Sequence, residues 1–307
     1  MSAQNVSLSA MFGWVTDSFK LFKKNYRALM SASLVTLVLV VLMCLPMWLV
    51  MMSSMSDMMK NSVNGAMPAN AMPFAGDMTT FYTMYAITIA VSLVAFPPIL
   101  IGWFKLCQNI DQNKAASGFD ILKPFANTQL WLRGIGFALL GLVVYAAVLG
   151  LFVLAFWGAI SDLMQQVNAQ QAAMLAGNTP VPSGFPVSLF FGYFAFIGIA
   201  TFLQFVYMVG FTEISLRPTS PMEAMKQAAI GIFKNALKLV LLFICVGTVF
   251  YIAMLIVGLI LGLIIVALSF IHPIIGAIAA FALFLPFLLC IYPLLFSGHY
   301  FMWNGIL

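Results

Sequence analysis

Few side chains in this sequence of 307 residues can carry out chemistry, because only 7% of them are charged. Glu213 is the most interesting acid, since it follows an apolar run and precedes Arg217 by four residues, the spacing of an ion pair on a helix. Lys105 stands three residues after Gly102, as Glu213 stands three residues after Gly210. If these segments pack around a pseudo-symmetry axis, Lys105 and Glu213 would meet in a polar contact between segments.

Gln204 is the main strongly polar side chain deep inside an apolar run. Such a residue more often hydrogen-bonds to a neighbouring helix than to a substrate, and we expect that role here. His272 and His299 have no acid or nucleophile close to them in the sequence. The cysteines are far apart and form no C-x-x-C pair, so we expect small packed residues rather than a metal or redox site; they are Cys44, Cys107, Cys245 and Cys290.

No familiar catalytic pattern is present: the sequence has no H-E-x-x-H, no G-x-S-x-G and no phosphate-binding G-x-x-x-x-G-K-[ST]. The apolar runs contain no pair of carboxylates, and ion-coupled transport usually requires charged residues at that depth. The sequence therefore predicts a protein that is not an enzyme and has neither a metal nor a cofactor.

Twelve of the 13 basic residues fall in three segments, each beside an apolar run. If six spans separate these segments, all three lie on one face, and the excess of Lys and Arg makes that face cytoplasmic, with both termini inside. The same cations can attract anionic lipid headgroups at about 1 kcal/mol each, or they can simply set orientation. Nucleic-acid binding is not indicated. The segments contain Lys20, Lys23, Lys24 and Arg27; then Lys105, Lys114, Lys123 and Arg133; then Arg217, Lys226, Lys234 and Lys238.

The elements that position these side chains are six long apolar runs in a chain that is 64% hydrophobic. Such a composition predicts an all-α polytopic membrane protein with six transmembrane helices. We expect polar loops at 53–80 and 161–186. The spans are expected near 30–52, 81–107, 132–160, 189–211, 237–268 and 273–300.

Short amphipathic helices are predicted before the first and fifth spans, with another interfacial segment at 118–125. Ser220, Pro221 and Glu223 form a capping box with proline at the first helical position. Aromatic residues on one face and lysines on another suit a membrane surface. The apolar stripes are Leu8, Met11, Phe12, Val15, Phe19, Phe22 and Tyr26, and then Met222, Met225, Ala229, Ile232, Phe233 and Ala236.

Internal similarity suggests three tandem units of interfacial helix plus helical hairpin within a single transmembrane domain of residues 1–307. LFKKNYRAL at 21–29 resembles IFKNALKLV at 232–240, and MSDMMKNSVN at 55–64 resembles ISDLMQQVNA at 160–169. We call these units repeats 1, 2 and 3, at about 1–112, 113–217 and 218–307. Convergence of apolar helices is the alternative.

The segments W-V-x-D-S-F-K-L-F-K-K-N and P-M-E-A-M-K-Q-A resemble a broad group of six-helix bacterial inner-membrane proteins of largely unknown function. That group is related to the membrane domain fused to some glycerophosphodiester phosphodiesterases. The resemblance implies a six-helix inner-membrane domain with an accessory role. It implies no activity, because the soluble catalytic domain of the fused relatives is not part of this sequence.

We therefore expect an accessory or scaffold protein that contacts membrane lipids or a protein partner, and that partner can be a second copy of the same chain. The alternative is a carrier or channel-like protein for a hydrophobic or lipid substrate. Gly258 and Gly262 form a G-x-x-x-G pattern that permits close helix approach, but the pattern is common in membrane helices.

Overall fold

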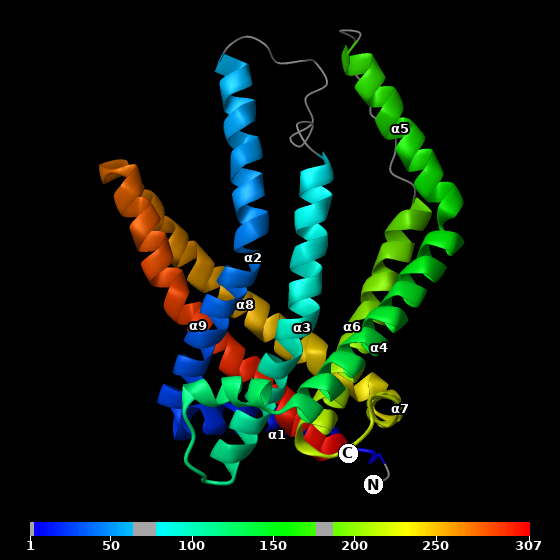
Figure 1. Ribbon diagram of the computed structural model, residues 1–307, viewed down its shortest axis with the longest axis vertical. Helices are drawn as coiled ribbons and strands as arrows, with labels where there is room; N and C mark the ends of the chain where they lie inside the picture. Colours follow the sequence, from blue (N-terminus) through cyan, green and yellow to red (C-terminus); the bar gives the residue numbers. More distant parts are fainter. Residues whose placement is uncertain (1–2, 64–77, 176–186) are drawn as a thin grey trace. The chain divides into compact units, whose positions relative to one another are not determined.

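The computed structural model describes residues 3–63, 78–175 and 187–307, and the regular structure in these ranges is helical (Figure 1). The elements are α1 (Leu8–Lys24), α2 (Tyr26–Val63), α3 (Met78–Asp111), the 3-10 helix η1 (Gly118–Ala126), α4 (Thr128–Ala155), α5 (Trp157–Leu175), α6 (Val187–Leu216), α7 (Pro221–Lys234), α8 (Ala236–Ile271) and α9 (Pro273–Ile306).

Six of these helices contain a segment long and apolar enough to cross a membrane, which confirms the six predicted runs. At a rise of 1.5 Å per residue, segments of this length reach about 40 Å or more, beyond the roughly 30 Å of a bilayer's hydrocarbon core. The segments are Tyr26–Ser53, Tyr82–Asp111, Thr128–Ala155, Val187–Leu216, Ala236–Ile271 and Ile278–Ile306.

The predicted loops are wrong where the structure describes them. Helix α2 continues through Val63, and α5 covers the Gln- and Ala-rich stretch up to Leu175 that we expected to be a loop. The third span also ends earlier than expected, at Ala155, with a break before Trp157. Met, Gln, Ala and Lys all favour helix, so polarity alone did not distinguish a loop from a helix end. The rest of both predicted loops, 64–77 and 176–186, lies outside the described residues.

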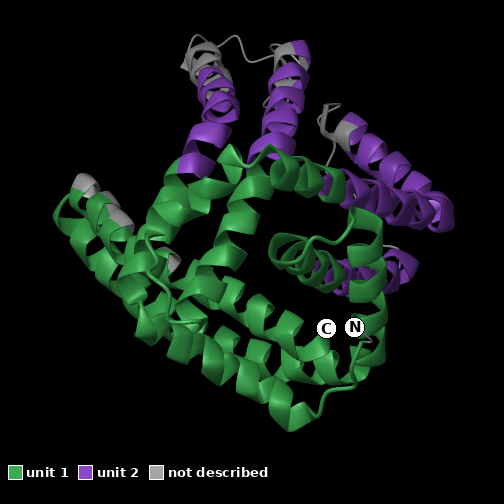
Figure 2. Ribbon diagram, turned by 60° about the horizontal axis from the view of Figure 1, so that its bottom comes forward, with its two compact units in different colours: residues 1–38, 96–137, 205–307 green, residues 39–95, 138–204 purple. Residues whose placement is uncertain are grey.

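The described helices divide into two compact units (Figure 2). Unit 1 comprises residues 1–38, 96–137 and 205–307, and unit 2 comprises residues 39–95 and 138–204. These units differ from the three predicted repeats, since unit 1 takes residues from every repeat. Unit 1 contains α1, η1 and α7, which we call the short helices, and is described first.

Aromatic side chains form the core of unit 1. Trp103 and Phe104 on α3 are fully buried, and the Trp103 ring stacks on Phe296 of α9 at a centroid distance of 4.7 Å. Phe137 of α4 meets Phe211 of α6 edge to face at 5.3 Å. Helix α1 packs against α8 and α9, and α7 packs against α8. Helices α1 and α7 therefore both pack against long helices.

Each short helix begins after a serine and ends at an asparagine. The Ser7 and Ser220 hydroxyls accept the backbone N–H of the third residue on, at 3.2 and 3.4 Å, and the Ser117 N–H donates to the Asp120 carboxylate at 2.9 Å. The predicted capping box is only half formed, because the Glu223 carboxylate accepts from Gln227 instead. The closing asparagines are Asn25, Asn127 and Asn235.

These asparagines separate a short helix from the long helix that follows. The side-chain oxygens of Asn25 and Asn127 accept the N–H of the third residue on, at 3.3 and 3.0 Å, so they cap α2 and α4. Asn235 differs, since its side-chain oxygen accepts the Val6 N–H at 2.9 Å. The polar side chain at each corner satisfies backbone groups that the helix ends leave unpaired.

The second long helix of each predicted repeat lies close to a short helix of the next one. A Cβ at Gly102 of α3 would fall 2.2 Å from the Ile121 carbonyl of η1, so only glycine permits this approach. A Cβ at Gly210 of α6 would lie 3.5 Å from the Ala224 carbonyl of α7. Since α9 also packs against α1, the three contacts form a closed cycle within unit 1.

In unit 2, α4 and α6 pack through aromatic rings. Phe152 of α4 lies 4.9 Å from Phe196 of α6, and a Cβ at Gly192 would overlap the Phe156 ring at 2.5 Å. The Tyr145 hydroxyl donates to the Ala200 carbonyl and to the Gln204 side chain, at 3.4 and 3.3 Å. This packing holds the apolar halves of the two helices together.

Candidate functional site

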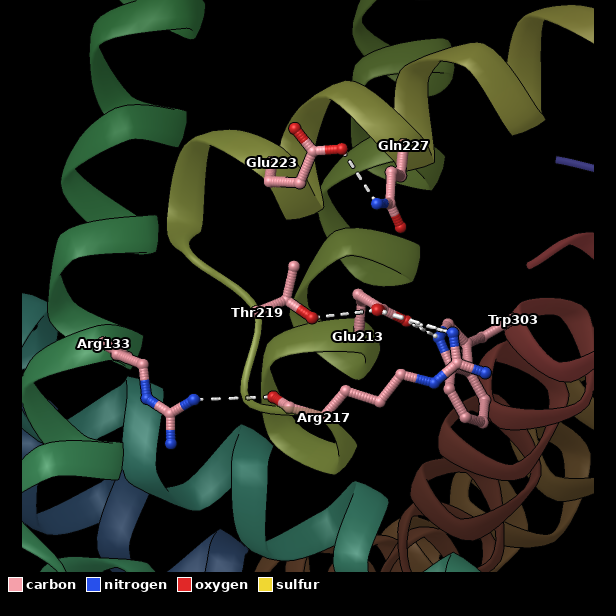
Figure 3. A network of polar contacts seen from close by, with 7 residues as sticks. All are labelled: Arg133, Glu213, Arg217, Thr219, Glu223, Gln227 and Trp303. Carbon is pink, nitrogen blue, oxygen red and sulfur yellow. Dashed lines mark hydrogen bonds and ion pairs between the residues drawn. The ribbon is translucent and has the colours of Figure 1, made fainter. Parts of the chain in front are cut away.

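The Glu213 carboxylate lies at the centre of a polar network in unit 1 (Figure 3). Its oxygens accept the Trp303 indole N–H at 2.8 Å, the Thr219 hydroxyl at 3.0 Å and an Arg217 guanidinium N–H at 3.2 Å. Glu213 is only 2% exposed. Because the last turn of a helix carries partial negative charge, a carboxylate at the end of α6 requires such donors.

The network joins parts of the chain that are far apart in sequence. Trp303 comes from α9, 90 residues beyond Glu213 of α6, and Thr219 lies just before α7. The Arg217 guanidinium also lies over the Trp303 ring, 4.9 Å from its centroid. Glu213 therefore joins α6 to α9, which we assigned to predicted repeats 2 and 3, and its ion pair is with Arg217 rather than with Lys105.

Lys105, by contrast, lines a pocket of about 450 Å³ together with Arg133 and Arg217. Arg133 reaches the Arg217 carbonyl oxygen at 3.5 Å, which connects this pocket to the Glu213 network. Gln204 lies elsewhere, in unit 2, where it accepts the Tyr145 hydroxyl. That hydrogen bond is the expected contact with a neighbouring helix, but it lies within repeat 2 rather than between repeats.

The first basic cluster lies around α1 and the start of α2. Lys20 forms an ion pair with Asp17 at 2.8 Å, and Lys24 donates to the Asp111 carbonyl at the end of α3. Arg27 lies beside the Tyr26 ring, 5.9 Å from its centroid. Lys23 is exposed. These cations lie on the outside of unit 1, and Lys24 also ties α1 to α3.

Two members of the third cluster hold the N-terminal segment. Lys234 donates to the Ala3 carbonyl at 3.1 Å, and Lys238 donates to the Asn5 side chain and the Val6 carbonyl. Asn235 adds a hydrogen bond to the Gln4 carbonyl at 2.8 Å. Lys226, on α7, is exposed. These lysines thus have a structural role that the sequence did not indicate.

The apolar face of each short helix is divided between the core and the surface. On α1 the buried residues are Met11, Trp14, Ser18 and Leu21, so of the predicted stripe only Met11 faces the core. Phe19, which belongs to that stripe, is 49% exposed. Phe119 of η1 and Phe233 of α7 are 66% and 77% exposed. An aromatic surface and a basic surface therefore occur together on the short helices.

Other contacts of unit 1 escaped the sequence analysis. The Tyr300 hydroxyl donates to the Asp111 carboxylate at 2.9 Å, which joins α9 to the end of α3. Trp303 was not predicted, because Glu213 lies 90 residues away from it, whereas Thr219 lies within six residues of Glu213. Asn127 was detectable, since an asparagine ends the similar segments at 25 and 235.

Among the described residues, no group of three His, Cys, Asp or Glu side chains could hold a metal ion. Cys107 is buried, Cys44 and Cys245 are exposed, and Cys290 is intermediate. The structure therefore offers no further donor cluster to consider in these ranges.

The described residues form an all-helical chain with six helices able to span a bilayer, and these define a polytopic membrane protein. Comparison with protein-family models, with curated proteins and with solved structures found no match to this chain.

Proposed function

We propose that this protein is a non-enzymatic, multi-pass protein of the bacterial inner membrane with an accessory or scaffold role, contacting anionic lipids or a protein partner. One observation carries the proposal: each short helix exposes both an aromatic and a basic side chain. Phe19 and Phe233 are followed directly by Lys20 and Lys234, and η1 exposes Phe119 and Lys123. The resemblance of two of these segments to inner-membrane proteins supports the same role.

A membrane surface offers a favourable environment both to the exposed aromatic rings and to the lysines of one short helix. The rings gain from the boundary of the acyl chains, while the charged ends remain among headgroups and water. The long helices that follow leave many large apolar side chains exposed, which suits lipid rather than water. In this arrangement α1, η1 and α7 lie in the plane of the interface.

We infer that the three short helices belong to three tandem units. The shared serine start and asparagine end, and the cyclic contacts of α3, α6 and α9 with the next short helix, support this interpretation. With six spans, the basic segments fall on one face. The excess of Lys and Arg there favours a cytoplasmic face that contains both termini.

Spin labels on neighbouring residues of α1 test the interfacial placement. Phe19 and Lys20 are adjacent, and each is changed to cysteine in a protein whose Cys44, Cys245 and Cys290 are serine. The buried Cys107 is retained. After reconstitution in vesicles, a label at 19 should be accessible to oxygen, which concentrates in lipid. A label at 20 should be accessible to a water-soluble nickel chelate.

The two labels share one helix, so a difference between them reports the direction of each face rather than the depth of the whole helix. The same pattern is expected for Phe233 and its neighbour Lys234 on α7. Equal access of the nickel chelate to positions 19 and 20 would place α1 in water and overturn the interfacial role.

A further inference from the structure

The pocket that contains Lys105 is built where α3, α4 and α6 end or begin. Lys105 and Gln108 come from α3, Arg133 from α4 and Arg217 from the residue after α6. These segments belong to repeats 1 and 2, and all lie within unit 1. A volume of about 450 Å³ is large enough for a lipid headgroup or another small ligand.

Three cations line this pocket, and of the described residues that line it none is acidic. Elsewhere in unit 1 the cations are often neutralised, as Lys123 is by Asp120 at 2.8 Å. Within residues 3–63, 78–175 and 187–307, neither Lys105 nor Arg133 forms an ion pair with a carboxylate. Two cations in a concave site without an acid favour an anionic ligand.

The Arg133 guanidinium is oriented by the protein. One of its N–H groups donates to the Arg217 carbonyl at 3.5 Å, and the planar fork has further donors. Arg217 is held in turn by its ion pair with the buried Glu213. The Arg133 side chain is therefore oriented toward the end of α6 before a ligand arrives, which lowers the entropic cost of binding.

Amide side chains complete the lining of the pocket. Gln108, Asn109 and Asn127 all lie along it. The Asn127 side-chain oxygen already accepts the Leu130 N–H at 3.0 Å, so the other half of that amide, its NH₂ group, is a donor. Guanidinium, ammonium and amide donors around one cavity match the several acceptor oxygens of a phosphate group.

We propose that this pocket binds an anionic phosphate group through Lys105 and Arg133, while the Arg217 guanidinium stays paired with Glu213 (Figure 3). Its place at the ends of the spans puts it at the depth of lipid headgroups, so an anionic phospholipid can supply the phosphate; this source rests on the proposed membrane-surface role. A soluble phosphate offers the same chemistry, and the experiment separates the two sources.

The test uses the full-length protein in a neutral detergent, with bound phosphatidylglycerol counted by native mass spectrometry during a lipid titration. Phosphatidylcholine is the zwitterionic reference. Replacing Lys105 and Arg133 together with Gln should weaken phosphatidylglycerol binding about tenfold or more, because two charge-assisted contacts are lost. Phosphatidylcholine binding should not change.

A matched variant removes two charges of the short helices, outside the pocket: Lys123→Gln with Lys226→Gln. Both side chains are exposed and contribute a diffuse attraction that physiological salt screens over about 8 Å, so this variant should weaken phosphatidylglycerol binding clearly less than the pocket variant does. Lys105→Gln alone leaves the Arg133 contact with Arg217 intact. If the double variant elutes as an aggregate, the phosphatidylglycerol binding of Lys105→Gln is compared with that of the wild type instead.

Inorganic phosphate identifies the source. Displacement of bound phosphatidylglycerol by millimolar phosphate, in wild type only, supports a site that accepts soluble phosphate as well. Lipid binding without displacement supports a headgroup site. Equal lipid binding by the pocket variants and the matched variant would overturn the pocket, whereas the spin labels on α1 test the membrane-surface role independently.

Discussion

Replacing Trp303 by phenylalanine removes one donor from a buried carboxylate and keeps an aromatic ring at the same place. The indole N–H lies 2.8 Å from the Glu213 oxygen, and both side chains are buried. A hydrogen bond to a charged group contributes about 1.5–3 kcal/mol to stability. Because Arg217 and Thr219 still donate to Glu213, we expect a loss near the lower end of that range.

Trp103 provides a matched control for the same substitution. It is also buried, and its N–H donates at 2.9 Å to the Thr36 hydroxyl, a neutral acceptor. A neutral hydrogen bond contributes about 0.5–1.5 kcal/mol. Both variants lose the same atoms from a buried site, so the cost of the smaller ring largely cancels. Trp303→Phe should therefore lower the free energy of unfolding by about 1 kcal/mol more than Trp103→Phe does.

The free energies are measured by reversible unfolding in mixed micelles with rising SDS, followed by circular dichroism. A second background, Glu213→Gln, keeps an acceptor for Trp303 but removes the charge. In that background the cost of Trp303→Phe should fall by about 1 kcal/mol, which a double-mutant cycle reports directly. An equal cost for both tryptophans, together with zero coupling to Glu213, would refute the charged hydrogen bond as the source of stability.

Three further predictions concern the short helices. Gly102→Ala should lower the thermal midpoint in detergent sharply, because the Cβ overlaps the backbone of Ile121, whereas Gly258→Ala should leave it unchanged, since nothing lies within 4 Å. Burial of Asp120 by itself raises the pKa of its carboxyl, but the Lys123 and Ser117 hydrogen bonds outweigh it and hold that pKa below its usual range. A lowered carboxyl pKa stabilises the folded state above the ordinary pKa near 4. The loss in free energy of unfolding caused by Asp120→Asn should therefore be largest at neutral pH and should disappear as the pH falls through the lowered pKa. Unfolding followed by circular dichroism measures this loss, and a loss independent of pH would contradict the prediction. Replacing Lys20, Lys23, Lys24 and Arg27 with Gln removes the charges of the first cluster. This change should weaken the insertion or orientation of the first hairpin, while the hairpins beside the other two clusters keep their orientation. Unchanged topology reporters would contradict this.

The six long helices could be predicted because hydropathy over about twenty residues is a strong signal. The face of α1 that points toward the protein could not be predicted. Trp14 faces the protein and Phe19 faces outward, yet both are aromatic. Lipid chains are as apolar as a protein core, so hydrophobicity cannot separate the two faces. The Glu213–Arg217 pair followed from its spacing of four residues, but Trp303 did not, since only the packing of α9 brings it there.

The cyclic contacts of unit 1 make the two ends of the chain depend on each other. The Gln4 N–H donates to the Ile306 carbonyl at 2.9 Å, and Lys234 and Asn235 hold the same N-terminal segment. None of these partners exists until α7, α8 and α9 have been made. The first short helix therefore reaches its final contacts only after α9 is in place.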